Sequence, residues 1–576
     1  MKIKKRHTFI LGAFILAVGG IIAKLIGAFY KVPLTHILGS NGLGVYYLIF
    51  PLYSLLLVLS SSGVAIAVTK LVAAERARKN KDNEMKIFTA GLILSFSISI
   101  FFSIIIILYS EQFSLLQGNA NATIGYIAIA PAIVCASVIS IVRAYFQGIE
   151  NMLPTSISTI FEQTIKLLFG LLLSYKLLFL GVEYAVLGAV LGVTVSEFLA
   201  MLLIIVNFLV YKKKYDYKFF EVEGKLVKKR INTFYKKVLK SKKKFIHSVK
   251  KVKKNRFNVC FNKEYITYKT AFATVIKYSF PATLSSIIIP ITGFVDSFLI
   301  INLLIRTGFS STVATSLYGL SNGIVASLIS LPVLLIVSIS TAIVPNLSRY
   351  DEKAVNTVQT KCGFFIKLTW LLALPMFVFF VLYSPEIIKI LFGGGLTDKG
   401  FLEYNFAYKL LMFGSVSIIY YAFFQTFTAI LQAINKPAIP FIALFISLIF
   451  RIIFTYIFVS IPEINVFGVM LSNVVFLSIA SFICLLFIKK HIVLNINLRR
   501  FLVRPIFALG IAVICAYFIK LFLMNFMHTI FYSIISGLIG IAVYLVLIYT
   551  TKVFTHAEEE MFALRLRSRK FKLQRK

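Results

Sequence analysis

Long apolar stretches recur along the whole chain and are separated by short polar segments. Each stretch has about 20 residues or more, which is enough for a helix to cross ~30 Å of hydrocarbon. A large soluble helical core would not contain uninterrupted apolar runs of this length. The predicted fold class is therefore an all-α polytopic membrane protein with about fourteen transmembrane helices, at residues 8–35, 43–70, 87–110, 122–147, 155–178, 184–211, 271–304, 312–347, 362–391, 403–432, 438–460, 464–488, 502–524 and 527–551.

Composition supports this class. Of 576 residues, 59% are hydrophobic and only 14% are charged, whereas soluble domains are about one quarter charged. The first apolar run follows the basic sequence MKIKKRH, as in a secretory signal, but no small-residue cleavage site closes it. We therefore expect an uncleaved first helix.

Basic residues gather in alternate loops. MKIKKR, ERARKNKDNEMK, the segment 212–269, KKHIVLNINLRR and RLRSRKFKLQRK fall on one side of the predicted membrane. The opposite loops, such as LGSNGLG and EQFSLLQGNAN, are nearly free of Lys and Arg. The positive-inside rule therefore predicts that both termini are cytoplasmic, which agrees with an even number of spans.

The spans divide into six, six and two. We expect an N-terminal six-helix lobe at 1–211, a basic cytoplasmic linker at 212–269, a C-terminal six-helix lobe at 270–490, a terminal helix pair at 491–551 and a basic cytoplasmic tail at 552–576. Transporters built from two such repeats hold the substrate between them. The first helix of each lobe is expected to be broken, at Gly19, Gly20 and Gly27 in one and at Pro281 and Pro290 in the other.

The linker 212–269 carries about twenty Lys and Arg and four acidic residues. Apolar residues recur in it at spacings of three, four or seven, which is typical of an amphipathic basic helix. Such a helix could bind anionic inner-leaflet lipids, at about 1 kcal/mol per Lys. A disordered Lys-rich linker is the alternative. In a soluble protein the net charge of +39 would suggest binding to nucleic acid. Here the basic residues gather in loops on one side of the predicted membrane, so no nucleic-acid partner is expected.

Ionisable and amide side chains inside the spans are the candidate site, because a charge at the bilayer centre costs about 2.5–3.5 kcal/mol on insertion scales. Lys24 and Lys31 share one helix face, being seven residues apart. Lys24 lies in mid-span and needs a partner, an aqueous cavity or an anionic ligand. The other candidates for the substrate cavity are Arg143, Gln147, Glu162, Lys166, Asp296, Gln425 and Arg451.

Structural roles compete for several of these residues. Glu162 and Lys166 could pair with each other, since they are four residues apart. Lys277 and Lys409 are expected to snorkel to an interface. Asp296 could neutralise a cavity lysine or act as a cation ligand. Because the excess charge inside the membrane is positive, the candidate cavity suits an anion such as a phosphate or pyrophosphate head group.

Enzyme chemistry has little support in the sequence. The five cysteines are scattered without a CxxC pair, and no HxxxH or carboxylate cluster has metal-ligand spacing. No GxxxxGK[ST] motif is present, and the short outer loops hold no paired carboxylates for a glycosyltransferase or polymerase. The expected protein is a membrane transporter without a cofactor.

The stretch FQGIENMLPTSISTIFEQTIKLL at 146–168 resembles the pattern FQGxxNMxPTAxSQxxEQ of the SpoVB-like polysaccharide flippases. These belong to a superfamily that includes the MurJ lipid II flippases and the MATE drug exporters. GGIIAKLIGAFYK at the start, ILFGGG at 390–395 and LQAINKPAIP at 431–440 are also similar to this family. The resemblance covers nearly the whole chain.

The resemblance implies a two-lobed fold of fourteen helices that works by alternating access in the bacterial plasma membrane. It implies a lipid-linked saccharide as cargo, moved outward for wall, surface-polymer or spore synthesis. Lys24 and Lys31 match basic residues of the first helix in MurJ-type relatives. Other cavity arginines of that type have no clear counterpart, and the eighth helix offers Asn322 and Ser327 instead. A coupling ion is possible, and a monomer is expected. The main alternative is a MATE-type exporter of organic cations.

Overall fold

The structure is a computed structural model of the chain. It describes residues 2–78, 80–239, 266–347, 355–396, 401–434, 436–493, 497–555 and 558. All regular structure within these ranges is helical. Thirteen helical stretches in them are long and apolar enough to cross a membrane. The predicted all-α polytopic fold is thus confirmed.

Residues 2–239 form the N-terminal half. Its helices are α1 (Lys2–Leu57), η1 (Val58–Ser62), α2 (Gly63–Ala77), α3 (Lys81–Leu108), α4 (Ser110–Leu116), η2 (Ala120–Ala122), α5 (Thr123–Gly148), α6 (Leu153–Leu177), η3 (Leu178–Leu180) and α7 (Val182–Leu239).

Residues 266–493 form the C-terminal half, and a terminal helix pair follows. The half contains α9 (Tyr268–Ser286), α10 (Ile288–Arg306), α11 (Ser311–Tyr318), η4 (Gly319–Val325), α12 (Ala326–Leu347), α13 (Val355–Leu382), α14 (Ser384–Leu396), α15 (Phe401–Gly414), α16 (Ser417–Ala433), α17 (Ala438–Ser460) and α18 (Phe467–His491). The terminal pair, preceded by η6 (Arg499–Val503), is α19 (Arg504–Met524) and α20 (Thr529–Thr550).

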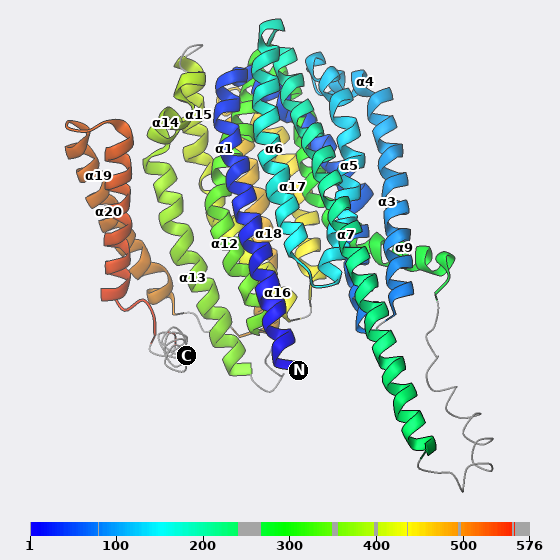
Figure 1. Cartoon of the computed structure of the whole chain (residues 1–576). Helices are drawn as coiled ribbons and strands as arrows, with labels where there is room; N and C mark the ends of the chain where they lie inside the picture. Colours follow the sequence, from blue (N-terminus) through cyan, green and yellow to red (C-terminus); the bar gives the residue numbers. More distant parts are fainter. Residues whose placement is uncertain are drawn as a thin grey trace.

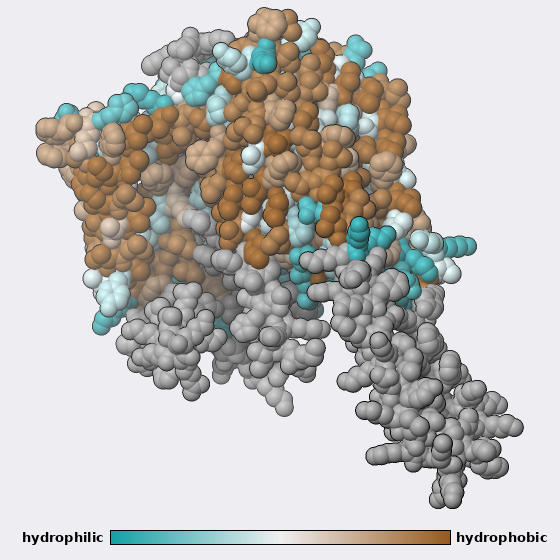
Figure 2. All heavy atoms as spheres, viewed as in Figure 1, coloured by the Kyte–Doolittle hydropathy of each residue, from teal (hydrophilic) through white to brown (hydrophobic). Residues whose placement is uncertain are grey.

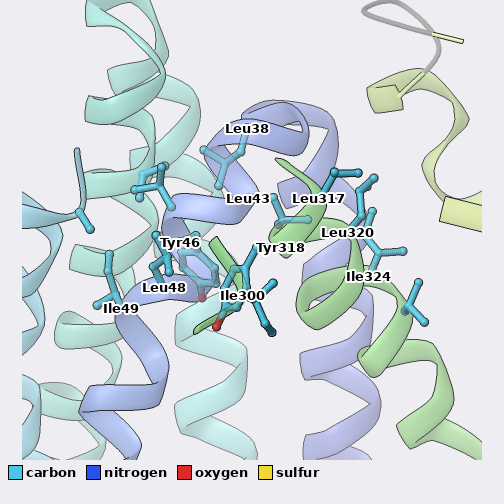
Figure 3. Packing of buried hydrophobic residues seen from close by; sticks show 14 of the residues in the cluster. Leu38, Leu43, Tyr46, Leu48, Ile49, Ile300, Leu317, Tyr318, Leu320 and Ile324 are labelled. Carbon is cyan, nitrogen blue, oxygen red and sulfur yellow. The ribbon is translucent and has the colours of Figure 1, made fainter. Parts of the chain in front are cut away.

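The first two predicted spans form one continuous helical assignment that reverses direction at Gly39. Gly39 has φ 65° and ψ −175°, a conformation that a residue without a Cβ adopts readily. Figure 3 shows the chain turning over between Leu38 and Leu43 and descending through Tyr46 and Ile49. The stretch Val18–Ala77 is therefore long enough to cross twice, so the thirteen stretches of the described ranges are sufficient for fourteen crossings.

The seventh predicted span is broken as expected. Its two helices, α9 and α10, meet at Ile287, between the helix-weakening Pro281 and Pro290. The corresponding expectation for the first span is wrong, because α1 runs without interruption through Gly19, Gly20 and Gly27 up to the Gly39 turn. Glycine lowers helix stability by only about 1 kcal/mol, which packing on neighbouring helices can offset.

The described chain begins and ends at the same end of the helix bundle, where α1 starts and α20 stops (Figure 1). Apolar side chains cover a broad band of the visible face, and polar side chains gather above and below it (Figure 2). α7 has 58 residues and is about 87 Å long at 1.5 Å per residue, so it extends beyond this band (Figure 1). The helix includes the start of the basic linker, whereas residues 240–265 lie outside the described ranges.

The two halves touch in a tight contact near the Gly39 turn, which we call the seal (Ser40, Gly44, Asn119, Thr315 and Gly319). A Cβ on Gly44 would lie 2.1 Å from the carbonyl oxygen of Thr315, so the two backbones meet directly. The Asn119 amide donates a hydrogen bond of 2.9 Å to the Thr315 hydroxyl. Residues 20–31 of α1 lie roughly 12–29 Å from Gly39 along the helix, so the space beside them is closed off at the seal end.

The terminal pair is joined to the C-terminal half by two buried ion pairs. Lys520 of α19 lies 2.6 Å from Glu386 of α14. Lys367 of α13 lies 2.8 Å from Glu558, which follows α20. Each pair removes the cost of leaving one charge buried alone, so the pairs fix α19 and α20 against the bundle.

Candidate functional site

Polar residues inside the bundle line three cavities. The first, which we call the lysine cavity, has a volume of about 590 Å³ and lies between α1, α6 and the start of α12. Its polar lining comes from both halves of the chain and includes Lys24, Lys31, Tyr47, Gln163, Lys166, Ser327 and Ser330. Three of the predicted residues, Lys24, Lys31 and Lys166, thus face one cavity.

Lys31 and Lys166 are held by neutral groups. The Lys31 ammonium donates a hydrogen bond of 2.5 Å to the Ser327 hydroxyl and lies 5.3 Å from the centre of the Tyr47 ring. The Lys166 ammonium lies 5.6 Å from the Tyr30 ring and 5.2 Å from the Phe50 ring. Cation–π contacts stabilise a lysine without cancelling its charge.

Lys24 occupies the junction of two cavities. It is exposed and lines both the lysine cavity and a second one of about 400 Å³. Within the described part of the chain, Lys24, Lys31 and Lys166 take part in none of the ion pairs found at up to 4.0 Å. The lysine cavity therefore presents three positive charges without bound carboxylates.

The second cavity, the amide cavity, is lined by Lys24 of α1 and otherwise by residues of the C-terminal half. Its polar lining includes Asp296, Asn322, Gln425, Arg451 and Asn473. Arg451 donates to both carboxylate oxygens of Asp296, at 3.4 Å and 2.5 Å, and also to the Asn473 amide oxygen at 2.5 Å. A guanidinium thus occupies the place that a cation on Asp296 would need, which argues against the cation-ligand role considered for this residue. Asp296 also does not neutralise a cavity lysine.

The third cavity, the carboxylate cavity, lies within the N-terminal half and has a volume of about 630 Å³. Its charged and amide lining consists of Lys70, Arg143, Gln147, Glu162 and Glu197. The Arg143 guanidinium lies 2.9 Å from the Glu162 carboxylate and donates a further hydrogen bond of 2.8 Å to Ser158. Arg143, Gln147 and Glu162 therefore line a cavity other than that of Lys24 and Lys31.

The contacts of Glu162 correct one expectation. Its carboxylate binds Arg143 and the Gln163 amide, the latter at 2.9 Å, and it does not pair with Lys166. The i,i+4 spacing allowed a pair with Lys166, but Arg143 of the neighbouring helix α5 donates one guanidinium N–H to Glu162 and another to Ser158.

Lys277 and Lys409, expected to snorkel, are both exposed and line none of the three cavities. Sequence reasoning named Ser327 in the eighth predicted span, and this residue lines the lysine cavity. It did not name Ser330, which lines the lysine and amide cavities, or Asn473, which lines the amide cavity. A polar residue that recurs in an apolar span, such as Ser327 and Ser330 at i,i+3 on α12, was the available signal. Within the described residues, no group of three or more His, Cys, Asp or Glu could hold a metal ion.

The sequence matches two protein-family models. The model described as polysaccharide biosynthesis protein matches residues 9–351, and the model described as lipid II flippase MurJ matches residues 267–538. Stage V sporulation protein B of Bacillus subtilis is 22% identical over 514 residues, which are 89% of each chain. The lipid II flippase MurJ of Bacillus subtilis is 22% identical over 467 residues, covering 77% of this chain and 76% of that one.

Solved structures share the fold. A structure of lipid II flippase MurJ in an inward closed conformation matches with a TM-score of 0.65 and 18% identity, over 94% of this chain and 99% of that one. An inward-facing MATE family transporter matches with a TM-score of 0.58 and 15% identity, over 81% and 94%. Since the first family model spans more than half of the chain, the protein belongs to the polysaccharide biosynthesis protein family, as a SpoVB-like member of the MurJ/MATE superfamily.

Proposed function

We propose that this protein is a flippase that moves a polyprenyl-pyrophosphate-linked saccharide from the inner to the outer leaflet of the bacterial plasma membrane. The cargo would be lipid II or another precursor of a wall or surface polysaccharide. The observation that carries the proposal is the lysine cavity, in which Lys24, Lys31 and Lys166 face one volume of about 590 Å³. Three cations without carboxylate partners suit a pyrophosphate head group.

The position of the cavity supports alternating access. Its lining comes from α1 and α6 on one side and from α12 on the other, so a movement of the two halves would change its shape. With both termini in the cytoplasm, as the loop charges predict, the seal lies on the outer side. The structure would then represent a form that accepts cargo from the inside.

The membrane potential would favour outward transport. Moving one charge through 100 mV is worth about 2.3 kcal/mol, so an anionic group with two net charges would gain ~4–5 kcal/mol when the cytoplasm is negative. A MATE-type exporter of organic cations has the same fold, but it would need a cavity with excess negative charge. The lysine cavity has the opposite sign.

The test is to follow the leaflet distribution of lipid-linked saccharides. In cells depleted of this protein, and of any redundant flippase, one such lipid should accumulate on the cytoplasmic leaflet. The purified protein in liposomes should move the same lipid from one leaflet to the other. If no lipid-linked saccharide accumulates and none is moved, the proposed function is wrong.

A further inference from the structure

The amide cavity carries polar side chains to which the proposed transport step assigns no role. Its volume of about 400 Å³ is within the range of about 300–1,000 Å³ that is usual for small-ligand sites. Amide side chains from three elements of the C-terminal half line it, namely Asn322 of η4, Gln425 of α16 and Asn473 of α18. A few polar groups placed among apolar walls are what fixes the orientation of a small ligand. The amide cavity therefore has the composition of a binding site.

These amides keep donors and acceptors for a ligand. Within the described part of the chain, the half-buried Gln425 makes no hydrogen bond. Asn473 accepts from Arg451 through its Oδ1, and since a guanidinium has no acceptor, the Asn473 NH₂ group keeps both donors for another partner. The Asn322 amide donates at 3.3 Å to the Ser321 hydroxyl, and its oxygen remains an acceptor. Half-buried amides with unused hydrogen-bonding groups favour a polar ligand.

The charges of the amide cavity compensate each other. Arg451 donates to both oxygens of Asp296, and its guanidinium carbon lies 5.4 Å from the centre of the Phe476 ring. An acidic ligand would therefore meet a guanidinium that is already bonded and a carboxylate that repels it. Hydroxyl groups both donate and accept hydrogen bonds, so they match the amides without needing a charge. Beyond Lys24 at its border, the amide cavity thus suits a neutral group that is rich in hydroxyls.

The amide cavity is continuous with the lysine cavity. Lys24 and Ser330 line both, whereas the described lining residues of the carboxylate cavity include none of those of the lysine cavity. In a pyrophosphate-linked saccharide the first sugar is bonded directly to the pyrophosphate, so the two must bind side by side. When the lysine cavity holds the pyrophosphate, the amide cavity is the adjoining space for the sugar.

We propose that the amide cavity is a saccharide subsite, which binds a neutral sugar while the lysine cavity holds the pyrophosphate attached to it. The inference rests on the proposed function for the cargo, and it adds where the sugar binds and which charge it carries. The two cavities then divide the recognition. The lysines of α1 and α6 bind the anion that all such cargoes share, and Gln425 and Asn322 select the saccharide through hydrogen bonds to its hydroxyls.

Titration calorimetry of the purified full-length protein with short-chain cargo analogues tests this. The reference probe is the methyl ester of geranyl pyrophosphate, which has the same pyrophosphate charge as a sugar conjugate. The other probes are geranyl pyrophosphate conjugates of glucose, galactose, N-acetylglucosamine and glucuronic acid. We expect at least one neutral conjugate to bind about tenfold more tightly than the reference probe. The glucuronic acid conjugate should bind no more tightly than the reference probe, because Asp296 repels its carboxylate.

Variants identify the residues that bind the sugar. Gln425→Leu keeps the bulk of the side chain but removes the amide, so it should weaken binding of the neutral conjugate by roughly 2–10-fold, the effect of one lost neutral hydrogen bond. Asn322→Ala should have a similar effect. Both variants should bind the reference probe within about threefold of the wild type, which shows that the lysine cavity is intact. The matched control is Gln147→Leu, which removes an amide of the carboxylate cavity and should leave the affinity for all probes unchanged.

The outcomes separate this inference from the proposed function. If the reference probe needs Lys24 and Lys31 but no neutral conjugate binds more tightly, or the gain survives Gln425→Leu and Asn322→Ala, the subsite is overturned and the anion site stands. If the gain depends on Gln425 but Lys24→Ala and Lys31→Ala change no affinity, the subsite stands and the proposed anion site fails. A loss of the gain in Gln147→Leu alone would place the sugar in the carboxylate cavity and overturn the inference.

Discussion

Lys31 of α1 donates a hydrogen bond of 2.5 Å to Ser327 of α12, and this contact joins the N-terminal and C-terminal halves across the lysine cavity. The serine hydroxyl in turn donates a hydrogen bond to the carbonyl oxygen of Gly323. Ser327 therefore satisfies the ammonium while no anion is present, and an incoming phosphate oxygen would compete for the same proton donor.

The two partners should accordingly differ in their effect on anion binding. Lys31→Ala removes a charge-assisted hydrogen bond worth about 1.5–3 kcal/mol, so pyrophosphate affinity should fall by roughly 10–150-fold. Ser327→Ala leaves the ammonium in place and should change the affinity by less than about threefold. Calorimetry on both variants checks this. Equal losses in the two would mean that the Lys31–Ser327 contact only holds the halves together.

Lys24 should be necessary for transport because it borders both the lysine cavity and the amide cavity. Lys24→Ala should abolish movement of the lipid-linked saccharide in liposomes while leaving membrane insertion and thermal stability unchanged. Lys277→Ala is the matched control, since this lysine is also exposed but lines none of the three cavities. Full activity in Lys24→Ala would mean that the Lys24 ammonium extends to the membrane–water interface and does not bind the cargo.

The Arg143–Glu162 pair should contribute to stability. Its side chains are only 17% and 13% exposed, and removing one partner of a buried pair costs about 3–5 kcal/mol. Arg143→Ala should therefore lower the melting temperature strongly, and the double variant Arg143→Met, Glu162→Leu should restore most of the loss. Arg78→Ala provides the comparison, because Arg78 pairs with Glu75 while 72% exposed and such pairs contribute about 1 kcal/mol or less. Thermal unfolding in detergent measures all three.

The spans and the Gly39 turn were predictable because apolar length and glycine-rich loops are local features of the sequence. The loop LGSNGLG between the first two predicted spans contains Gly39, and the chain reverses there. The break at Ile287 was also predictable, from Pro281 and Pro290, whereas the break at Tyr383, between α13 and α14, depends more on what packs around it. Apolar runs continue through both points, so hydropathy alone joins the flanking helices.

The partners of the charged residues were not predictable in the same way. The spacing along α6 indicates Lys166 as an ion-pair partner for Glu162. The actual partner is Arg143, and this pairing depends on how close α5 lies to α6. Asp296 and Arg451 are 155 residues apart, and nothing local in either span indicates that they meet. Lys24 and Lys31 could be predicted to share one helix face because they lie seven residues apart on one helix. Tertiary packing decides that Lys166 and Ser327 line the same cavity.

The seal should control which side of the protein is open. A Cβ on Gly44 would lie 2.1 Å from the Thr315 carbonyl oxygen and 2.7 Å from the Thr315 side chain, so Gly44→Ala should separate the two halves at this point.

Ser316 is buried at the seal, and its hydroxyl oxygen lies 3.4 Å from that of Ser40. In a variant without the native cysteines, Ser316→Cys should react slowly with a membrane-impermeant thiol reagent and should react at least several-fold faster when Gly44→Ala is added. Gly510→Ala is the control, because no heavy atom lies within 4 Å of its added Cβ. Unchanged labelling with Gly44→Ala would mean that the halves can stay closed without the direct backbone contact, and that the polar contacts of Asn119 and Ser40 suffice.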